Sequence, residues 1–166
     1  MKLSLLLVTD TNIWIDLEYG EVLSFVFQLP YKFITTDFAA NEIEYELWAS
    51  LVSLGVEAFG LSPEQISDIY LLNQNHHPVS IADLSCLVLT RDLPAILLSG
   101  DKPLRKLAEI QAIEVHGVLW LLDRLVDHLI ISPNQACVAL IRILAHNARL
   151  PEKPCKTRLR KWCSDA

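Results

Sequence analysis

The 166-residue sequence has no uninterrupted apolar run near the roughly 18 residues that a membrane helix requires. Its first apolar run is too short for the core of a signal peptide and leads directly into Asp10. No internal repeat, low-complexity segment or interdomain linker interrupts the chain. We therefore expect a single cytoplasmic domain, and a content of 52% hydrophobic and 20% charged residues predicts a globular one with a sizeable core.

The four cysteines lack the CxxC spacing that is typical of zinc sites and redox motifs. Cys86 and Cys137 lie in apolar helical patterns, which predicts that both are core residues. Cys155 and Cys163 are close enough in sequence to pair, but a cytoplasmic location favours reduced thiols. The sequence therefore predicts neither a zinc site nor a disulfide.

Charge is unevenly distributed along the chain. Residues 142–166 carry a net charge of +5, which leaves −11 for residues 1–141 out of a total of −6. An acidic body with a basic tail suits a metal site together with a patch that contacts phosphate, and a solvated helix explains the tail equally well. Trp162, among the basic residues of the tail, is the tryptophan best placed to stack on a base. The other three are expected in the core: Trp14, Trp48 and Trp120.

Apolar strand patterns alternate with helical patterns, which favours an α/β fold with a mainly parallel central sheet of four to five strands flanked by helices. The clearest strands are residues 3–8, 32–36 and 94–98, with a short edge strand at 113–115 and either a connector or a strand in 54–61. Helices are expected at 11–17, 21–28, 38–51 (with Asp37 as N-cap), 63–72, 81–91, 102–110, 117–131 and 132–147, followed by a tail that is helical at most in part.

Four acidic residues are expected to meet at one edge of this sheet. Asp10 and Asp101 each follow an apolar strand, so both belong at the carboxyl edge, where open α/β sheets bind ligands. Glu42 and Asp83 lie in the first turn or so of helices that leave the same region. Each acid also has a structural explanation, because acids are common at helix N-termini.

The joint placement of these acids favours a metal site. Carboxylates that lie close together repel one another and raise each other's pKa unless a cation neutralises them. Hard oxygen ligands with open positions for water suit Mg²⁺ or Mn²⁺. Such an ion polarises a phosphate group and lowers the pKa of a bound water.

Four motifs resemble, in order and spacing, the acidic signature of the PIN-domain nucleases. They are Thr9-Asp10-Thr11-Asn12-Ile13, Asn41-Glu42-Ile43, Ser80-Ile81-Ala82-Asp83 and Leu98-Ser99-Gly100-Asp101, within residues 3–130. Glu44 and Glu46 compete with Glu42, and Glu46 would share a face with it on one regular helix. The preceding segment Thr35-Thr36-Asp37-Phe38 favours Glu42, because it is similar to the strand-to-helix segment that carries the second acid of the family.

The resemblance implies a PIN-like nuclease domain at residues 1–131, with residues 132–166 as a C-terminal helical extension and basic tail of the same domain. It implies a metal-dependent ribonuclease, often the toxin of a VapC-type toxin–antitoxin pair, with an antitoxin as protein partner and a homodimeric state. In such an enzyme a metal-activated water attacks an RNA phosphodiester in line. Asp10, Asp83 and Asp101 would hold one or two Mg²⁺ or Mn²⁺ ions, Glu42 would be a ligand or orient water, and Asn12 and Ser99 would position these groups or the substrate.

Two other functions compete with the nuclease. A non-catalytic interaction module would fill the same acidic pocket with an arginine from a protein partner. A receiver-like or phosphatase domain is disfavoured, because the Asp-Thr-Asn motif at residues 10–12 lacks a second aspartate two residues on. His76 and His77 are expected to be surface residues, since adjacent residues in a loop rarely chelate one ion. Lys102, Arg105 and Lys106 either contact phosphate or form the solvent face of their helix.

Overall fold

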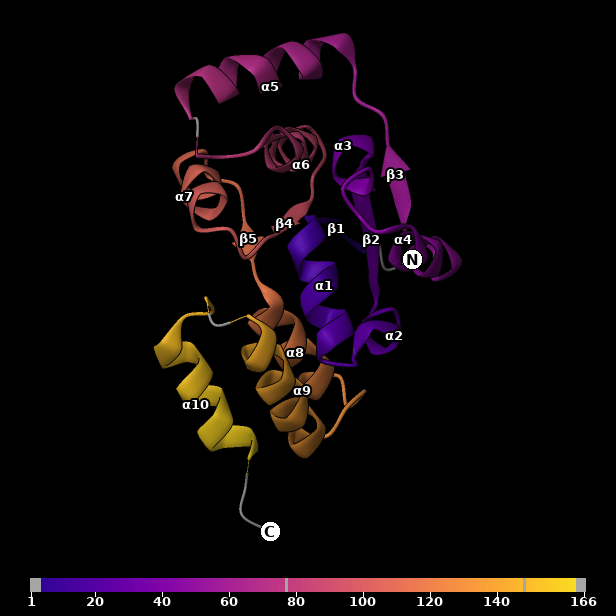
Figure 1. Ribbon diagram of the computed structural model, residues 1–166, viewed down its shortest axis with the longest axis vertical. Coiled ribbons are helices and arrows are strands. Elements are labelled where there is room, and N and C mark those ends of the chain that lie inside the picture. Colours follow the sequence, from indigo (N-terminus) through magenta and orange to yellow (C-terminus); the bar gives the residue numbers. More distant parts are fainter. Residues whose placement is uncertain (1–3, 77, 148, 164–166) are drawn as a thin grey trace. The chain divides into compact units, whose positions relative to one another are not determined.

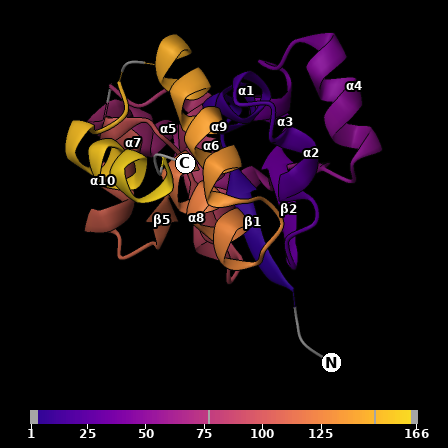
Figure 2. The same ribbon diagram turned by 90° about the horizontal axis from the view of Figure 1, so that it is seen from below.

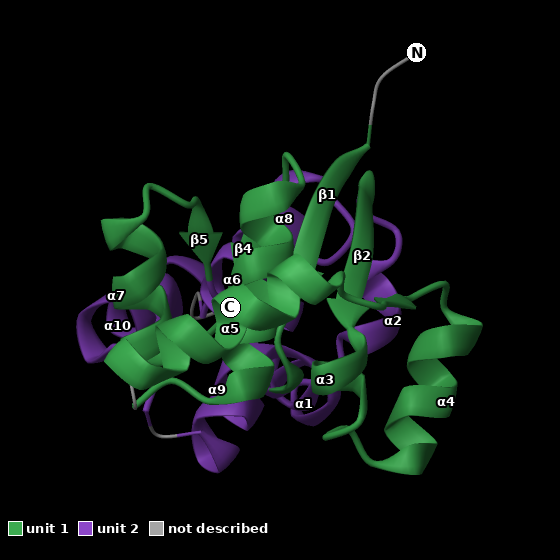
Figure 3. Ribbon diagram, turned by 90° about the horizontal axis from the view of Figure 1, so that it is seen from above, with its two compact units in different colours: residues 1–11, 30–116 green, residues 12–29, 117–166 purple. Residues whose placement is uncertain are grey.

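A computed structural model of the chain describes residues 4–76, 78–147 and 149–163, so Leu3 and His77 lie outside the described residues. The chain forms two compact units, coloured separately in Figure 3. Unit 1 consists of residues 1–11 and 30–116, and unit 2 of residues 12–29 and 117–166. No helix within the described ranges combines the length and the apolar character needed to cross a membrane.

Unit 1 contains a sheet of five strands in the order β3-β2-β1-β4-β5, and all neighbouring strands are parallel. The fold is therefore α/β, and the predicted mainly parallel sheet of four to five strands is confirmed. Leu7 and Val8 of the central strand are fully buried, as expected for an apolar run in a parallel sheet. The strands are β1 (Leu5–Thr9), β2 (Tyr31–Thr36), β3 (Glu57–Phe59), β4 (Ile96–Leu98) and β5 (Val115–His116).

Helix α6 is the centre of unit 1. It packs against β1, β2 and β4, and against the three helices between which it lies in Figure 1. Leu84, Leu87 and Val88 of α6 enter the same core as Val8 and Leu97 of the sheet. The middle of α6 is buried on every side, since Ala82 and all residues from Leu84 to Thr90 are buried. The helices of unit 1 are α3 (Asp37–Ala40), α4 (Tyr45–Ser53), α5 (Pro63–Asn75), α6 (Ile81–Asp92) and α7 (Lys102–Ile110).

The single helix expected at residues 38–51 is wrong, because two helices, α3 and α4, replace it. Thr36 is the N-cap in place of Asp37, since its side chain accepts a hydrogen bond from the N–H of Ala39. After α3 the backbone forms hydrogen bonds between residues three positions apart, as in a 3₁₀ turn. One example is Glu42 N to Ala39 O at 3.1 Å. Glu44 then adopts an extended conformation (φ −57°, ψ 143°), which ends any helical continuity. Glu42 and Glu46 are therefore not on one regular helix.

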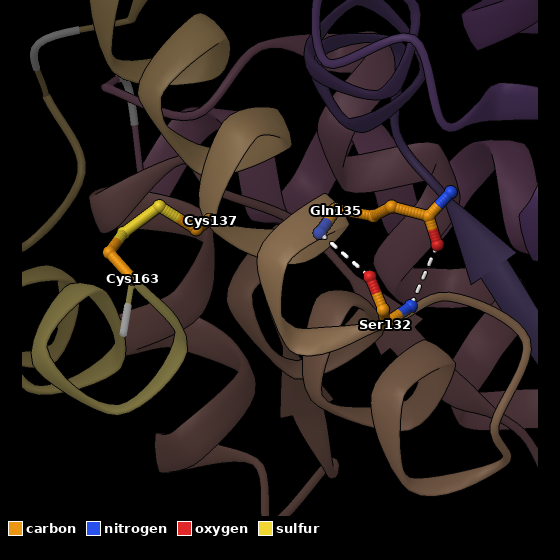
Figure 4. Close-up of a disulfide and its surroundings, with 4 residues drawn as sticks. All are labelled: Ser132, Gln135, Cys137 and Cys163. Carbon is orange, nitrogen blue, oxygen red and sulfur yellow. Dashed lines mark hydrogen bonds between the residues drawn. A yellow bond between two sulfur atoms is a disulfide. The ribbon is translucent and has the colours of Figure 1, made fainter. Parts of the chain in front are cut away.

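The described part of unit 2 is helical. Helix α8 packs against α2 and α9, and α9 packs along α10, as Figure 2 shows for the last pair. Ser132 caps α9 as predicted: its Oγ accepts from Gln135 N at 3.1 Å, and its own N–H donates to Gln135 Oε1 at 2.8 Å (Figure 4). The helices are α1 (Thr11–Tyr19, whose first residue belongs to unit 1), α2 (Leu23–Val26), α8 (Val118–Asp127), α9 (Pro133–His146) and α10 (Glu152–Trp162).

The C-terminal tail is helical in part, because residues 152–162 form α10. It differs from its prediction in two ways. Trp162 is only 1% exposed, so it is a core residue of unit 2 and cannot stack on a base. Cys163 forms a disulfide with Cys137 of α9, with the two Cα atoms 5.3 Å apart (Figure 4). The prediction of four reduced thiols is therefore wrong, because the packing of α10 on α9 brings together two cysteines that are 26 positions apart.

Candidate active site

Asp10 lies at the centre of the carboxyl edge of the sheet. It follows β1 directly and is 1% exposed. Its N–H donates to the carbonyl oxygen of Leu98 at 3.1 Å, which joins the ends of β1 and β4. Its Oδ2 accepts a hydrogen bond from Ser99 Oγ at 2.5 Å. Because Ser99 is fully buried, its hydroxyl holds the Asp10 carboxyl group in one orientation.

Asp101 is connected to Asp10 through the same serine. The N–H of Asp101 donates to Ser99 Oγ at 3.1 Å, so one hydroxyl contacts the Asp10 carboxyl group and the Asp101 backbone. Asp101 is also the N-cap of α7, where its Oδ2 accepts from Leu104 N at 3.0 Å. Asp101 therefore has the helix-capping role expected of an acid at a helix N-terminus. This role is compatible with a position beside Asp10.

The charges of Asp101 and Glu42 both act on Asp83. Asp83 is half-buried in the first turn of α6, which Ser80 caps by accepting from Asp83 N at 3.1 Å. Burial, then the charge of Asp101 and more weakly that of Glu42 raise the pKa of the Asp83 carboxyl group to about 6, against a smaller opposing effect of Ser80. A carboxylate raises the pKa of another in this way only at short range. Asp101 and Glu42 therefore each lie near Asp83.

The sequence did not predict that Cys86 is a neighbour of the site. Its buried thiol donates to the carbonyl oxygen of Thr9 at 3.9 Å. Burial, together with the charges of Asp10 and Asp83, raises the pKa of this thiol to about 12. Cys86 is therefore an inert thiol beneath the acids. The sequence signalled only that it is a core residue, which is confirmed.

Two observations relate the acids to one another. Ser99 forms hydrogen bonds with both Asp10 and Asp101, and the charges of Asp101 and Glu42 raise the pKa of Asp83. Within the part of the chain that the structure describes, no group of three or more His, Cys, Asp or Glu residues has the arrangement of a metal site. The chemistry of the four acids nevertheless fits a hard divalent cation, because their donors are all oxygens and the charges of Asp101 and Glu42 raise the pKa of Asp83.

Of the remaining predicted site residues, Asn12 is exposed in the first turn of α1 and belongs to unit 2, whereas the four acids belong to unit 1. Arg105 differs from its exposed neighbours Lys102 and Lys106, because its Nη1 donates to the carbonyl oxygen of Ser99 at 2.9 Å. Three bases from residues 142–166 form ion pairs within unit 2: Arg142 with Glu21, Lys156 with Glu152, and Arg158 with Asp123.

A parallel sheet with carboxyl groups gathered at its carboxyl edge assigns the chain to the α/β proteins that have an acidic site at the strand ends. A family model described as "DUF3368: PIN domain" matches residues 6–164, and the chain therefore belongs to this PIN domain family. The match extends beyond residue 130, so α9 and α10 are included in it. PIN domains are generally nucleases, and the family therefore suggests nucleic acid binding. No curated protein matches the sequence.

Proposed function

We propose that this protein is a metal-dependent endoribonuclease that hydrolyses RNA phosphodiester bonds. The observation that carries the proposal is the placement of Asp101 and Glu42 near the half-buried Asp83, next to the Asp10–Ser99–Asp101 hydrogen bonds. Repelling carboxyl groups at the ligand-binding edge of a sheet destabilise the empty site and are stabilised by a bound cation. Membership of a family of nucleases supports the same conclusion.

In the proposed site, Asp10, Asp83 and Asp101 hold Mg²⁺ or Mn²⁺, which when bound polarises the phosphate and acidifies a water molecule. Ser99 keeps the Asp10 carboxyl group oriented by donating to its Oδ2. Glu42, an exposed residue, is either a further ligand or accepts a hydrogen bond from the attacking water. We assign Asn12 to substrate positioning.

Glu42 is favoured over Glu46 as the second acid. Glu42 is the glutamate whose charge raises the pKa of Asp83, whereas Glu46 has no part in that shift. Glu46 also belongs to a separate helix, α4. We therefore expect that Glu42→Gln reduces activity strongly, while Glu46→Gln leaves it near the parent value.

The test is cleavage of single-stranded RNA by the full chain with Mg²⁺ or Mn²⁺. We expect that Asp10→Asn and Asp101→Asn each lower the rate by a factor on the order of 100 or more, since each removes a charged ligand of the metal ion that would stabilise the negative charge of the transition state. Glu64→Gln, in the first turn of α5, is the matched control for loss of one negative charge in unit 1. Equal rates for the parent and Asp10→Asn would rule out this mechanism. A parent that binds no metal and cuts none of several RNAs would favour an acidic pocket for an arginine of a protein partner.

The proposal extends to a cytoplasmic toxin that forms a homodimer and is blocked by an antitoxin. A small gene directly upstream that encodes a DNA-binding protein is the expected genomic context. Growth arrest on expression of the parent, relieved by coexpression of that neighbour, would support this role. Growth arrest of the same strength with Asp10→Asn would contradict it, because toxicity would then not depend on the acids.

A further inference from the structure

A chain of buried hydroxyl groups connects the start of α3 with the first turn of α6. Thr36 Oγ1 and Ser85 Oγ are 2.6 Å apart, and both residues are fully buried. Thr36 Oγ1 also accepts from Ala39 N at 3.1 Å, and Ser85 Oγ donates to the carbonyl oxygen of Ala82 at 2.5 Å. This chain of hydrogen bonds therefore passes through two side chains that are 49 positions apart in the sequence.

The proton positions in this chain follow from counting donors. A hydroxyl group has one proton to donate. The Ser85 proton is directed to Ala82 O, so Thr36 must donate to Ser85. Thr36 in turn accepts from the backbone N–H of Ala39. All three hydrogen bonds point in one direction, and loss of either hydroxyl leaves a buried polar partner unsatisfied.

Both ends of this hydroxyl chain adjoin the candidate acids. Ala82 directly precedes Asp83. At the other end, the carbonyl oxygen of Ala39 accepts from Glu42 N at 3.1 Å and from Thr11 Oγ1 at 3.2 Å, and Thr11 directly follows Asp10. These hydrogen bonds therefore link the peptide group of Asp83, through the backbone of Ala39, with the peptide group of Glu42 and with the side chain of the residue after Asp10. All members of this network belong to unit 1.

Such a network has a task that apolar packing does not perform. Asp83 lies in the first turn of α6 and Glu42 in the turn that follows α3, so any movement of α6 relative to α3 changes the spacing of their carboxyl groups. Directional hydrogen bonds between buried groups resist that movement, because each has a narrow range of favourable distance and angle. We propose that Thr36 and Ser85 are positioning residues, which act through the peptides next to Glu42 and Asp83 to fix the spacing of these carboxylates for a divalent cation. This inference rests on the proposed function.

The test uses the full chain and Mn²⁺ alone as the probe, with affinity measured by titration calorimetry and stability measured by urea unfolding. Ser85→Ala and Thr36→Val remove one hydroxyl each, and Thr36→Val preserves the shape of the side chain. We expect both to raise the dissociation constant for Mn²⁺ about ten- to a hundredfold, the effect typical of groups that orient metal ligands. RNA cleavage at subsaturating Mn²⁺ should fall by a similar factor.

Two further variants separate positioning from stability. Thr36→Ser keeps the hydroxyl and loses a buried methyl group, so it should lower stability and retain Mn²⁺ affinity. Thr90→Val is the matched control in α6, because Thr90 is 2% exposed and its hydroxyl donates to Cys86 O at 2.7 Å without joining the chain. It should also retain the parent affinity, whatever its effect on stability.

The outcomes distinguish this inference from the proposed function. The positioning role alone is overturned if the parent binds Mn²⁺ and cuts RNA, but Ser85→Ala and Thr36→Val bind Mn²⁺ no more weakly than Thr90→Val does. A parent that neither binds Mn²⁺ nor cuts RNA overturns both proposals. In the double variant the loss of affinity should be no larger than in one single variant, because either substitution interrupts the same chain. If the losses of Mn²⁺ affinity in the two single variants add fully in the double variant, the two hydroxyl groups do not act through one chain of hydrogen bonds.

Discussion

Burial of Asp83, together with the charges of the neighbouring acids, should make this residue a source of instability in the metal-free protein. Asp83 is the residue to change, because its pKa is raised from 3.8 to about 6. Below pH 4 the carboxyl group is protonated in both the folded and the unfolded chain and contributes nothing. Between pH 4 and 6 the unfolded chain loses this proton first, so stability falls as the pH rises. Above pH 6 the full penalty is present.

The magnitude follows from the shift. About two pKa units correspond to roughly 3 kcal/mol, and screening by solvent at this half-buried position reduces the penalty to about 1.5 kcal/mol. Asp83→Asn removes the penalty but also loses a favourable charge in the first turn of α6, which costs about 0.5 kcal/mol. We therefore expect that Asp83→Asn stabilises the protein by about 1 kcal/mol at pH 8 and leaves it unchanged or slightly weaker at pH 4.

The assay is urea unfolding at pH 4 and pH 8 in the presence of EDTA. Glu64→Gln isolates the loss of a negative charge from a first helical turn and should destabilise slightly at pH 8. Addition of Mn²⁺ at pH 8 should stabilise the parent more than Asp83→Asn, because a ligand stabilises the state that binds it. An Asp83→Asn variant with no gain in stability at pH 8, or with the same gain at both pH values, would refute the reasoning.

Two predictions concern unit 2. Cys137→Ser should lower the free energy of unfolding of the oxidised protein by about 3 kcal/mol and leave the reduced protein nearly unchanged, because the disulfide closes a loop of 26 positions. The oxidised parent, once denatured, should show only the thiols of Cys86 and Cys155, and four reactive thiols would contradict the disulfide. Asn147→Ala should cost about 1–3 kcal/mol in urea unfolding, because Asn147 Nδ2 donates to both oxygens of the buried Asp16 carboxyl group at 3.3 and 3.2 Å. No measurable loss would show that these hydrogen bonds do not stabilise the fold.

Helix starts and the positions of the main strands could be predicted because their signals are local. Ser62, Ser80, Asp101 and Ser132 each cap a helix, and each of these helices starts within a residue or so of where the sequence predicts it. A cap acts within one turn, so the residues that create it are visible in a short stretch of sequence. The apolar runs that form β1 and β4 are similarly local. The α/β fold followed from their alternation with the helices.

The errors arise where distant segments decide the outcome. The break between α3 and α4 depends on the extended backbone of Glu44, which no nearby glycine or proline announces. The Cys137–Cys163 disulfide and the burial of Trp162 require the packing of α10 on α9. Trp48 and Trp120 were expected in the core and are only partly buried.

The candidate site was predicted as a set of acids, and the structure adds how they are supported. Motif order was sufficient to select Asp10, Glu42, Asp83 and Asp101, whose metal-binding roles stay predictions. Thr36 and Ser85 had no such signal, because a threonine at a strand end and a serine within a helix are ordinary residues there. Their hydrogen bond joins positions 49 apart and becomes visible only when β2 and α6 pack together. The domain boundary between residues 131 and 132 also stays a prediction.

The most direct test of the central claim is a crystal structure of the protein grown with Mn²⁺, in which anomalous scattering locates the ion. The account predicts a peak at the carboxyl edge of the sheet, with carboxylate oxygens of Asp10, Asp83 and Asp101 as ligands. A peak bound by other residues, or no peak at saturating Mn²⁺, would contradict it.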